Sequence, residues 1–167
     1  VLLDLPLSRS KLDRAAHLRA DNASLEELYK RAKVISMIGD KFKTNEGGLT
    51  YGSSIETQGE RYFLGLDEAG TPYFVVHQAR SSHDAPDDFH SLRTIGAQLN
   101  DLDIGAAVHA LALTQWHEAH QRCAKCGEAT HPTFAGAVRE CNACGSSHHP
   151  RDRKSTRLNS SHQIISY

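Results

Sequence analysis

The clearest chemical signal in this sequence comes from four cysteines. They form two C-x2-C pairs, Cys123 with Cys126 and Cys141 with Cys144, and fourteen residues separate the pairs. Two such pairs at this distance are typical of a zinc site, because each tight turn places two thiolates on one side of the backbone and two turns complete a tetrahedron. The spacing predicts one Zn²⁺ per chain, held by all four cysteines in a closed site that is structural and not catalytic.

Three alternatives to a four-cysteine zinc site stay open. Two disulfides would require an oxidising compartment, and we expect no secretory signal at the start of the chain, where an acidic residue interrupts a short apolar run. A redox C-x2-C motif would be expected once, in a thioredoxin-like context, and not as two neighbouring copies. A histidine could also replace one thiolate, since His131, His148 and His149 lie near the cysteines in the sequence.

The segments before the cysteines predict a mixed α+β domain that ends in a helix leading to them. Asp21 or Asn22 would cap the first helix, and Asp101 or Asp103 the last. A short polar turn closed by glycine joins two β-rich runs into a hairpin. The predicted elements are a helix at 22–31, a strand at 33–38, a β-like stretch at 49–55, a hairpin of 61–66 with 71–76, an acidic loop at 79–90 and a long helix at 104–120.

The chain contains 11 histidines, and we expect most of them not to bind metal. His109, His117 and His120 fall on the predicted long helix. Histidines in that position either face solvent or pack where the ribbon meets the helix.

The predicted fold class is therefore α+β, with three parts along the chain. Residues 1–120 form the N-terminal domain, residues 121–151 the zinc ribbon, and residues 152–167 a tail. The stretch 153–167 has no regularly spaced apolar residues that could form a buried face, and it resembles translated sequencing adapter. We expect it to be non-native or disordered, and a genuine frayed terminus is the alternative.

Composition excludes several classes of protein. Hydrophobic residues make up 39% of the chain and charged residues 23%, which is typical of globular proteins and not of disordered chains. The net charge of −1 argues against binding to nucleic acid by bulk electrostatic attraction. No run approaches the roughly 18 apolar residues that a membrane span requires. We expect a soluble, cytoplasmic protein with no membrane partner.

Several segments of the chain together carry a resemblance to one known family: Leu12 to Arg19, Phe63 to Asp67, Pro72 to Phe74, Ser91 to Arg93, Ala110 to His117, the two cysteine pairs each followed by glycine, and Pro150-Arg151. In these segments the chain resembles the bacterial NADH pyrophosphatases of the Nudix superfamily. The resemblance runs in register over about residues 1–151.

That resemblance implies a zinc ribbon that joins an N-terminal mixed α/β domain to a C-terminal catalytic Nudix domain, in a homodimer. It further implies an intact enzyme that hydrolyses NAD(H) to AMP and nicotinamide mononucleotide, with Mg²⁺ or Mn²⁺ in its catalytic domain. NAD-capped RNA is a further candidate substrate of the family. The resemblance assigns no NAD(H)-binding residue in this chain.

The catalytic signature of the superfamily, G-x5-E-x7-R-E-(aliphatic)-x-E-E-x-G-(aliphatic), does not occur in the sequence. Its glutamates hold the metal ions that neutralise the pyrophosphate while water attacks phosphorus. Here Glu26-Glu27 lacks the glycine that should follow, and Arg139-Glu140 runs directly into Cys141, a predicted zinc ligand. We therefore expect no catalytic residue in this chain, which would be an inactive fragment of the enzyme by itself.

Two other functions compete with an enzyme fragment. A nucleic-acid-binding zinc ribbon usually presents a basic groove with several stacking aromatic side chains. The ribbon here has a charge excess of only +2 over residues 122–151, and Phe134 is its one aromatic residue. A protein-interaction scaffold is the other alternative, because the catalytic signature is missing.

Overall fold

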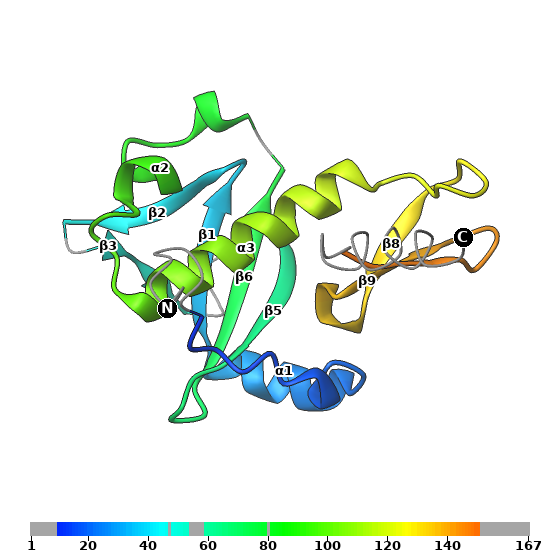
Figure 1. Ribbon diagram of the computed structural model, residues 1–167, viewed down its shortest axis with the longest axis horizontal. Helices are drawn as coiled ribbons and strands as arrows, with labels where there is room; N and C mark the ends of the chain where they lie inside the picture. Colours follow the sequence, from blue (N-terminus) through cyan, green and yellow to red (C-terminus); the bar gives the residue numbers. More distant parts are fainter. Residues whose placement is uncertain (1–9, 47, 54–58, 80, 151–167) are drawn as a thin grey trace, which may run out of the picture.

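The computed structural model describes residues 10–46, 48–53, 59–79 and 81–150, and these form a mixed α+β protein (Figure 1). The fold class predicted from the sequence is confirmed. The helices are η1 Ala16–Leu18, α1 Asn22–Lys30, η2 Ser82–Asp84, α2 Leu92–Ile95, α3 Asp101–Ala119 and η3 Phe134–Gly136. The strands are β1 Lys33–Ile38, β2 Lys41–Asn45, β3 Gly48–Leu49, β4 Tyr51–Gly52, β5 Glu60–Leu66, β6 Pro72–Gln78, β7 Phe89–Ser91, β8 Thr130–Thr133, β9 Val138–Cys141 and β10 Ser147–His148.

The larger sheet holds seven strands. Its main path runs β3-β2-β1-β6-β5, with β4 also paired to β1 and β7 to β2. β1 and β6 are parallel neighbours, whereas β5 and β6 form the antiparallel hairpin that the sequence predicts. Asp67 closes the hairpin turn, since its carboxylate accepts backbone hydrogen bonds from Ala69 and Thr71 at 3.0 and 2.8 Å.

Both faces of the larger sheet are covered by apolar side chains. Because successive side chains of a strand point to opposite faces, Ile35 and Val75 belong to the cluster that includes α3, whereas Val34 and Phe74 belong to the cluster that includes α1. Figure 1 shows α3 lying along the sheet and continuing beyond it toward the second sheet. Small side chains let α3 approach the strands closely, and those with no exposed surface are Ala106, Ala107 and Ala110.

Both α1 and α3 begin at a capping side chain, and the sequence predicts one of the two caps. The cap predicted for α1 is confirmed, because the Asp21 carboxylate accepts hydrogen bonds from the N–H groups of Ala23 and Ser24. The predicted start and cap of α3 are wrong. The helix begins three residues earlier, and the Asn100 side chain caps it by accepting from Leu102 and Asp103 at 3.0 and 2.9 Å. The aspartates predicted as caps lie in the first turn, where their negative charges interact favourably with the positive end of the helix dipole.

Two further segments differ from the expectation. The stretch 79–90, predicted as a loop, contains η2 and the beginning of β7. The β-like stretch predicted at 49–55 is divided into β3 and β4, and its last two residues, 54 and 55, lie outside the described residues. The predicted tail 153–167 lies outside them as well.

The second sheet is small and carries the cysteine pairs at its ends. Its strand order is β10-β9-β8, all antiparallel, and η3 forms the turn between β8 and β9. We call residues 121–150, which are the described part of the predicted zinc ribbon and contain this sheet, the ribbon. The isolated bridge of Arg122 with Ala129 closes its first turn.

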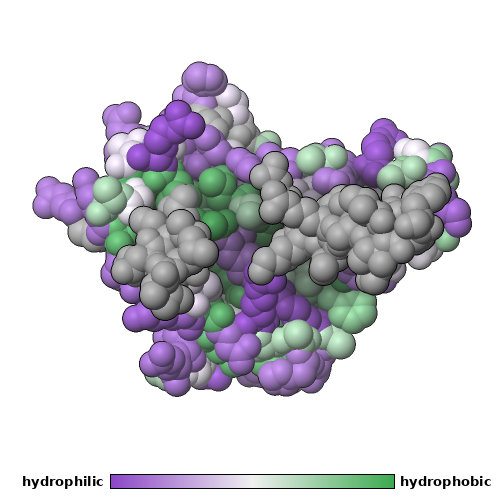
Figure 2. All heavy atoms as spheres, viewed as in Figure 1, coloured by the Kyte–Doolittle hydropathy of each residue, from purple (hydrophilic) through white to green (hydrophobic). Residues whose placement is uncertain are grey.

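The surface of the molecule is mixed in character. On the face shown in Figure 2, hydrophobic side chains gather over α3 near α2, and hydrophilic ones surround them. Four leucines of α2, of α3 and of the segment between these helices pack against the core while staying partly exposed: Leu92, Leu99, Leu102 and Leu111. No helix within the described parts of the chain is long and apolar enough to cross a bilayer.

Candidate metal centre

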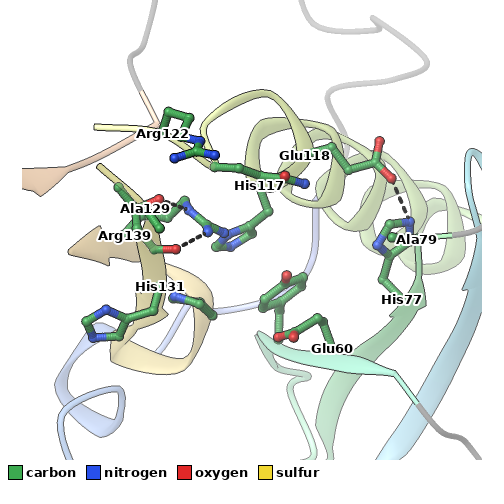
Figure 3. A pocket seen from close by; sticks show the side chains of 13 residues that line it. Glu60, His77, Ala79, His117, Glu118, Arg122, Ala129, His131 and Arg139 are labelled. Carbon is green, nitrogen blue, oxygen red and sulfur yellow. Dashed lines mark hydrogen bonds and ion pairs between the residues drawn. The ribbon is translucent and has the colours of Figure 1, made fainter. Parts of the chain in front are cut away.

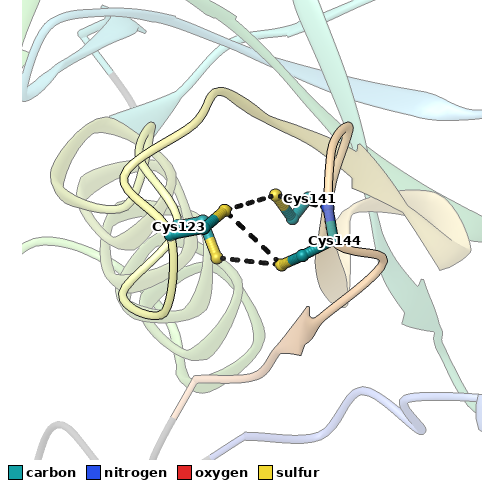
Figure 4. A group of neighbouring side chains, drawn as sticks. Cys123, Cys141 and Cys144 are labelled. Carbon is teal, nitrogen blue, oxygen red and sulfur yellow. Dashed lines mark hydrogen bonds between the residues drawn. The ribbon is translucent and has the colours of Figure 1, made fainter.

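The four cysteines converge on one point of the ribbon (Figure 4). All four sulfur atoms lie within 4.8 Å of one another. The Sγ atoms of Cys123 and Cys144 are 3.7 Å apart, those of Cys126 and Cys141 are 3.4 Å apart, and those of Cys126 and Cys144 are 3.5 Å apart. The spacing of the two pairs in the sequence therefore corresponds to a real cluster in space.

The two cysteine turns have nearly the same backbone geometry. In the first turn, Gly127 donates its N–H to the carbonyl of Cys123 at 2.9 Å, and in the second Gly145 donates to Cys141 at 3.2 Å. Both glycines have positive φ, 81° and 67°, which a residue with a side chain rarely adopts. The N–H groups of Lys125 and of Ala143 point to the first sulfur of their turns, each at 3.4 Å. Such N–H donors stabilise a thiolate, which is the form that binds metal.

Local hydrogen bonds also shift the pKa values of the thiols. Bonds with the side chain and backbone of Ser146 lower the pKa of Cys144 to about 6, and the backbone N–H of Cys144 lowers the pKa of Cys141. The backbone of Glu128 favours the Cys126 thiolate, but hydrogen bonds with the neighbouring thiols raise the pKa of Cys126 overall. The second turn therefore favours the metal-binding form of its cysteines.

The donor set fits a metal ion such as zinc. A tetrahedron with metal–sulfur bonds of about 2.3 Å has edges of about 3.8 Å, and the distances of 3.4 to 3.7 Å lie near that value. The four cysteines are free, so no disulfide joins them. Within the described residues, these cysteines are the one group of histidine, cysteine and acidic side chains close enough to hold an ion together.

One of the three nearby histidines touches the cluster. His148 places Nε2 3.3 Å from the sulfur of Cys123, where it can donate a hydrogen bond to a thiolate. The ring of His131 instead pairs with the side-chain oxygen of Asn142 at 2.5 Å, and His149 is exposed. His148 is therefore placed as a hydrogen-bond partner of a cysteine beside a complete set of four sulfurs.

A buried arginine attaches the ribbon to the rest of the molecule. Arg139 donates from Nε to the Thr130 hydroxyl and from Nη2 to the Thr130 carbonyl, both at 2.7 Å, and from Nη1 to Nδ1 of His117 at 2.9 Å. The Thr130 hydroxyl in turn donates to the carbonyl of His120 at 2.8 Å. β8, β9 and the C-terminal end of α3 are thereby joined through one guanidinium.

His117 is the counterpart of Arg139 on α3. Its ring stacks on Tyr62 of β5 with centroids 4.1 Å apart and 6° between the planes, and its Nε2 lies 2.8 Å from the carbonyl of Gly136. Since the carbonyl can only accept and Arg139 can only donate, His117 is neutral with its proton on Nε2. Burial lowers its pKa to about 4, and the nearby Arg139 acts in the same direction.

The histidines predicted on the long helix therefore differ from one another. His117 packs between helix and ribbon, which was one of the two expectations. His120 is exposed, with Nδ1 2.9 Å from the Trp116 carbonyl. His109 is partly buried, and burial together with the charge of Arg14 lowers its pKa to about 4.

Arg139 and Tyr62 were missed by sequence reasoning. A signal for Arg139 did exist, because it lies two positions before Cys141 in a strand and so shares the face of that buried cysteine. For Tyr62 the sequence offers an aromatic residue in a strand, which is equally typical of an ordinary core position.

Comparison with known proteins identifies the family. A family model described as "NADH pyrophosphatase-like rudimentary NUDIX domain" matches residues 14–116, which is more than half of the chain. The chain belongs to the NADH pyrophosphatase-like Nudix family. The matched range covers η1, α1, the larger sheet and most of α3, so in this family the larger sheet corresponds to a rudimentary Nudix domain.

Two relatives among curated proteins agree with this family. One is "NAD(P)H pyrophosphatase NUDT13, mitochondrial" from Homo sapiens, 30% identical over 122 residues, which cover 71% of this chain and 34% of that protein. The protein of the same name from Mus musculus is 30% identical over 139 residues, which cover 81% of this chain and 37% of that protein. This member of the NADH pyrophosphatase-like Nudix family thus spans about a third of the length of the curated relatives it matches.

Proposed function

We propose that this chain is the N-terminal domain and zinc ribbon of an NAD(H) pyrophosphatase. The observation that carries the proposal is the match of the NADH pyrophosphatase-like family model to the larger sheet, in a chain whose next segment gathers four cysteines. In this proposal residues 1–120 are the N-terminal domain, residues 121–151 the ribbon, and residues 152–167 a non-native or disordered tail.

In the ribbon, zinc would be bound by Cys123, Cys126, Cys141 and Cys144. Four thiolates leave no open position on the ion, so zinc would supply structural stability to a sheet too small to have an apolar core of its own. In this proposal the turn glycines, the backbone N–H groups near the sulfurs and Arg139 each support the site. Gly127 and Gly145 allow the turns, backbone N–H groups stabilise the sulfurs, and Arg139 holds the ribbon against α3.

The intact enzyme would hydrolyse NAD(H) to AMP and nicotinamide mononucleotide, with Mg²⁺ or Mn²⁺ bound in a catalytic Nudix domain. Both relatives carry the name of NAD(P)H pyrophosphatases, which supports a nicotinamide dinucleotide as the substrate class. Because the glutamate signature is missing from this sequence, we propose that the chain alone is inactive. A homodimer and activity on NAD-capped RNA belong to the same proposal, and rest on the family resemblance.

The cytoplasmic location is also a proposal. The names of both relatives place those proteins in mitochondria. Fractionation of source cells, with the chain followed by an antibody, decides between the two compartments.

The experiment for activity compares this chain with a longer one. NADH is incubated with the purified chain and Mg²⁺ or Mn²⁺, and AMP is measured by chromatography. We expect no AMP above the enzyme-free blank, whereas a chain extended by the natural coding sequence that follows Arg151 should release AMP. Release by the short chain at about 1 per second or faster, which is typical of enzymes, would contradict the proposal.

A nucleic-acid-binding ribbon gains no support from the structure. Phe134 is the one exposed large hydrophobic side chain among the described residues, at 47%, and single-strand binders stack bases on several aromatic side chains. We therefore do not propose that function.

A further inference from the structure

A cavity of about 500 Å³ opens between the ribbon and the larger sheet (Figure 3). Its walls come from three parts of the chain: Tyr62 and His77 from the sheet, His117 and Glu118 from α3, and Thr130 and Arg139 from the ribbon. Cavities of about 300 to 1,000 Å³ are the size that commonly accepts a small ligand. This cavity is separate from the cysteine cluster, since none of the four cysteines lines it.

The ribbon wall of the cavity is positively charged. Arg139 is only 7% exposed, and no ion pair joins it to a carboxylate among the described residues. A guanidinium has five N–H groups, and three of those of Arg139 have acceptors in Thr130 and His117. Two N–H groups are therefore left without an acceptor in the described residues. A buried cation that has no ion-pair partner costs free energy, which an anion bound in the cavity would offset.

A second arginine lines the same wall. Arg122 is exposed, and its side chain makes no hydrogen bond or ion pair with a carboxylate in the described part of the chain. Figure 3 shows Arg122 and Arg139 on the same side of the cavity, with His131 below them. Two guanidinium groups on one wall are suited to a phosphate group, because each can donate two parallel hydrogen bonds to its oxygens.

The opposite wall is acidic. Glu118 lies 3.4 Å from Nε2 of His77, and Glu60 lines the cavity beside them. Figure 3 shows these three residues across the cavity from the arginines. A ligand with a phosphate at one end and hydrogen-bond donors or a positive charge at the other would match both walls, and the charge separation would orient it.

We propose that this cavity binds a phosphate-bearing small molecule of nucleotide size, with the phosphate on Arg139 and Arg122 and a donor-rich end toward Glu60 and Glu118. The site is a binding site only, with no chemical step assigned to it. The proposal stands on the geometry of the cavity and does not depend on the proposed function of the chain.

The test uses AMP as the probe, with adenosine and inorganic phosphate as matched ligands. Binding to the full chain, purified with zinc present, is measured by isothermal titration calorimetry. We expect AMP to bind with a dissociation constant below about 1 mM, and adenosine and inorganic phosphate each to bind at least about tenfold more weakly. A dissociation constant for AMP above about 1 mM would overturn the proposal. If adenosine bound as tightly as AMP, the phosphate would not contribute to binding. If inorganic phosphate bound as tightly as AMP, the acidic wall would not contribute. Either result would overturn the proposal.

Arg122 is the side chain to change, because it is exposed and its loss should leave the fold intact. In Arg122→Glu we expect AMP affinity to fall by at least about tenfold. The matched control is Arg31→Glu, which makes the same charge change on an exposed residue just after α1, outside the lining of the cavity. An equal loss of affinity in the control would show nonspecific attraction to overall charge, and would overturn the proposal. Unchanged affinity in Arg122→Glu would do the same.

Discussion

Arg139 and His117 meet in a buried hydrogen bond, with Nη1 of the arginine 2.9 Å from Nδ1 of the histidine. One residue lies in the ribbon and the other on the long helix, 22 positions apart in the sequence. Neither side chain can be replaced without leaving the other short of a partner. This contact therefore couples the orientation of the ribbon to the stability of the larger domain.

The first prediction concerns Arg139→Gln. Glutamine is too short to reach both Thr130 and His117, so buried acceptors lose their donors, and each such loss costs about 1–3 kcal/mol. We expect the free energy of unfolding to fall by about 2–4 kcal/mol, measured by urea denaturation with zinc present. Arg31→Gln, at an exposed position, is the control and should change stability by less than about 0.5 kcal/mol. Equal stability of the two variants would show that the guanidinium does not hold the ribbon.

The second prediction concerns acid. The pKa of His117 is about 4 in the folded protein and about 6.5 when unfolded. Between these values the unfolded chain binds the proton and the folded chain does not, so stability is present above pH 6.5 and is lost as the pH falls toward 4. His109, whose pKa is also lowered to about 4, acts in the same window. For His117 we expect a loss of about 2–3 kcal/mol across this window, since each unit of pKa difference is worth about 1.4 kcal/mol.

His117→Gln separates this effect from the acid sensitivity of the cysteines. Glutamine keeps one donor and one acceptor but does not titrate, so its unfolding free energy should fall less steeply than wild type from pH 6.5 to 4. The matched control is His120→Gln, since His120 is exposed. Its slope should equal that of wild type. Equal slopes for His117→Gln and wild type would contradict the assignment of a buried, neutral histidine.

The third prediction concerns the metal. Purified without chelator, the chain should contain one zinc ion by elemental analysis. The Cys141→Ala variant should contain little or none, because it keeps only three of the four tetrahedral thiolate ligands and binds zinc weakly. Amide hydrogen exchange should rise in β8, β9 and β10 of the variant while β1 and β6 stay protected. Ala143→Ser, inside the same turn, is the control. Full zinc content in Cys141→Ala, or two disulfides in metal-free wild type, would contradict the site.

The parts of this structure that were predictable are those that depend on neighbours in the sequence. The hairpin of β5 and β6, the Asp21 cap and the cysteine turns are all set by residues within a few positions of each other. Even there, the sequence does not single out Asn100 as the cap of α3, because the aspartates that follow it are equally good capping residues.

The contact between the ribbon and the larger domain could not be found in the same way. Tyr62, His117 and Arg139 come from three elements, and each residue type alone is as common in an ordinary core or on an ordinary surface. What makes them a site is the burial of an arginine that forms no ion pair with a described carboxylate. That arrangement depends on how the helix and the ribbon approach each other, which no local pattern encodes.

The last prediction concerns Gly136, where the ribbon touches the sheet. Its φ is 88°, and a Cβ atom there would lie 2.5 to 2.9 Å from three atoms of the Tyr62 side chain. Tyr62 cannot move aside without losing its stacking on His117. Gly70 is a matched control, since its φ is 75° but a Cβ would meet nothing within 4 Å. Gly70→Ala therefore carries the backbone strain alone, about 1–2 kcal/mol. We expect Gly136→Ala to lose a further 1–3 kcal/mol or so from overpacking, measured by urea denaturation. If both variants lose the same stability, the close approach of the ribbon to Tyr62 is not a feature of the folded protein in solution.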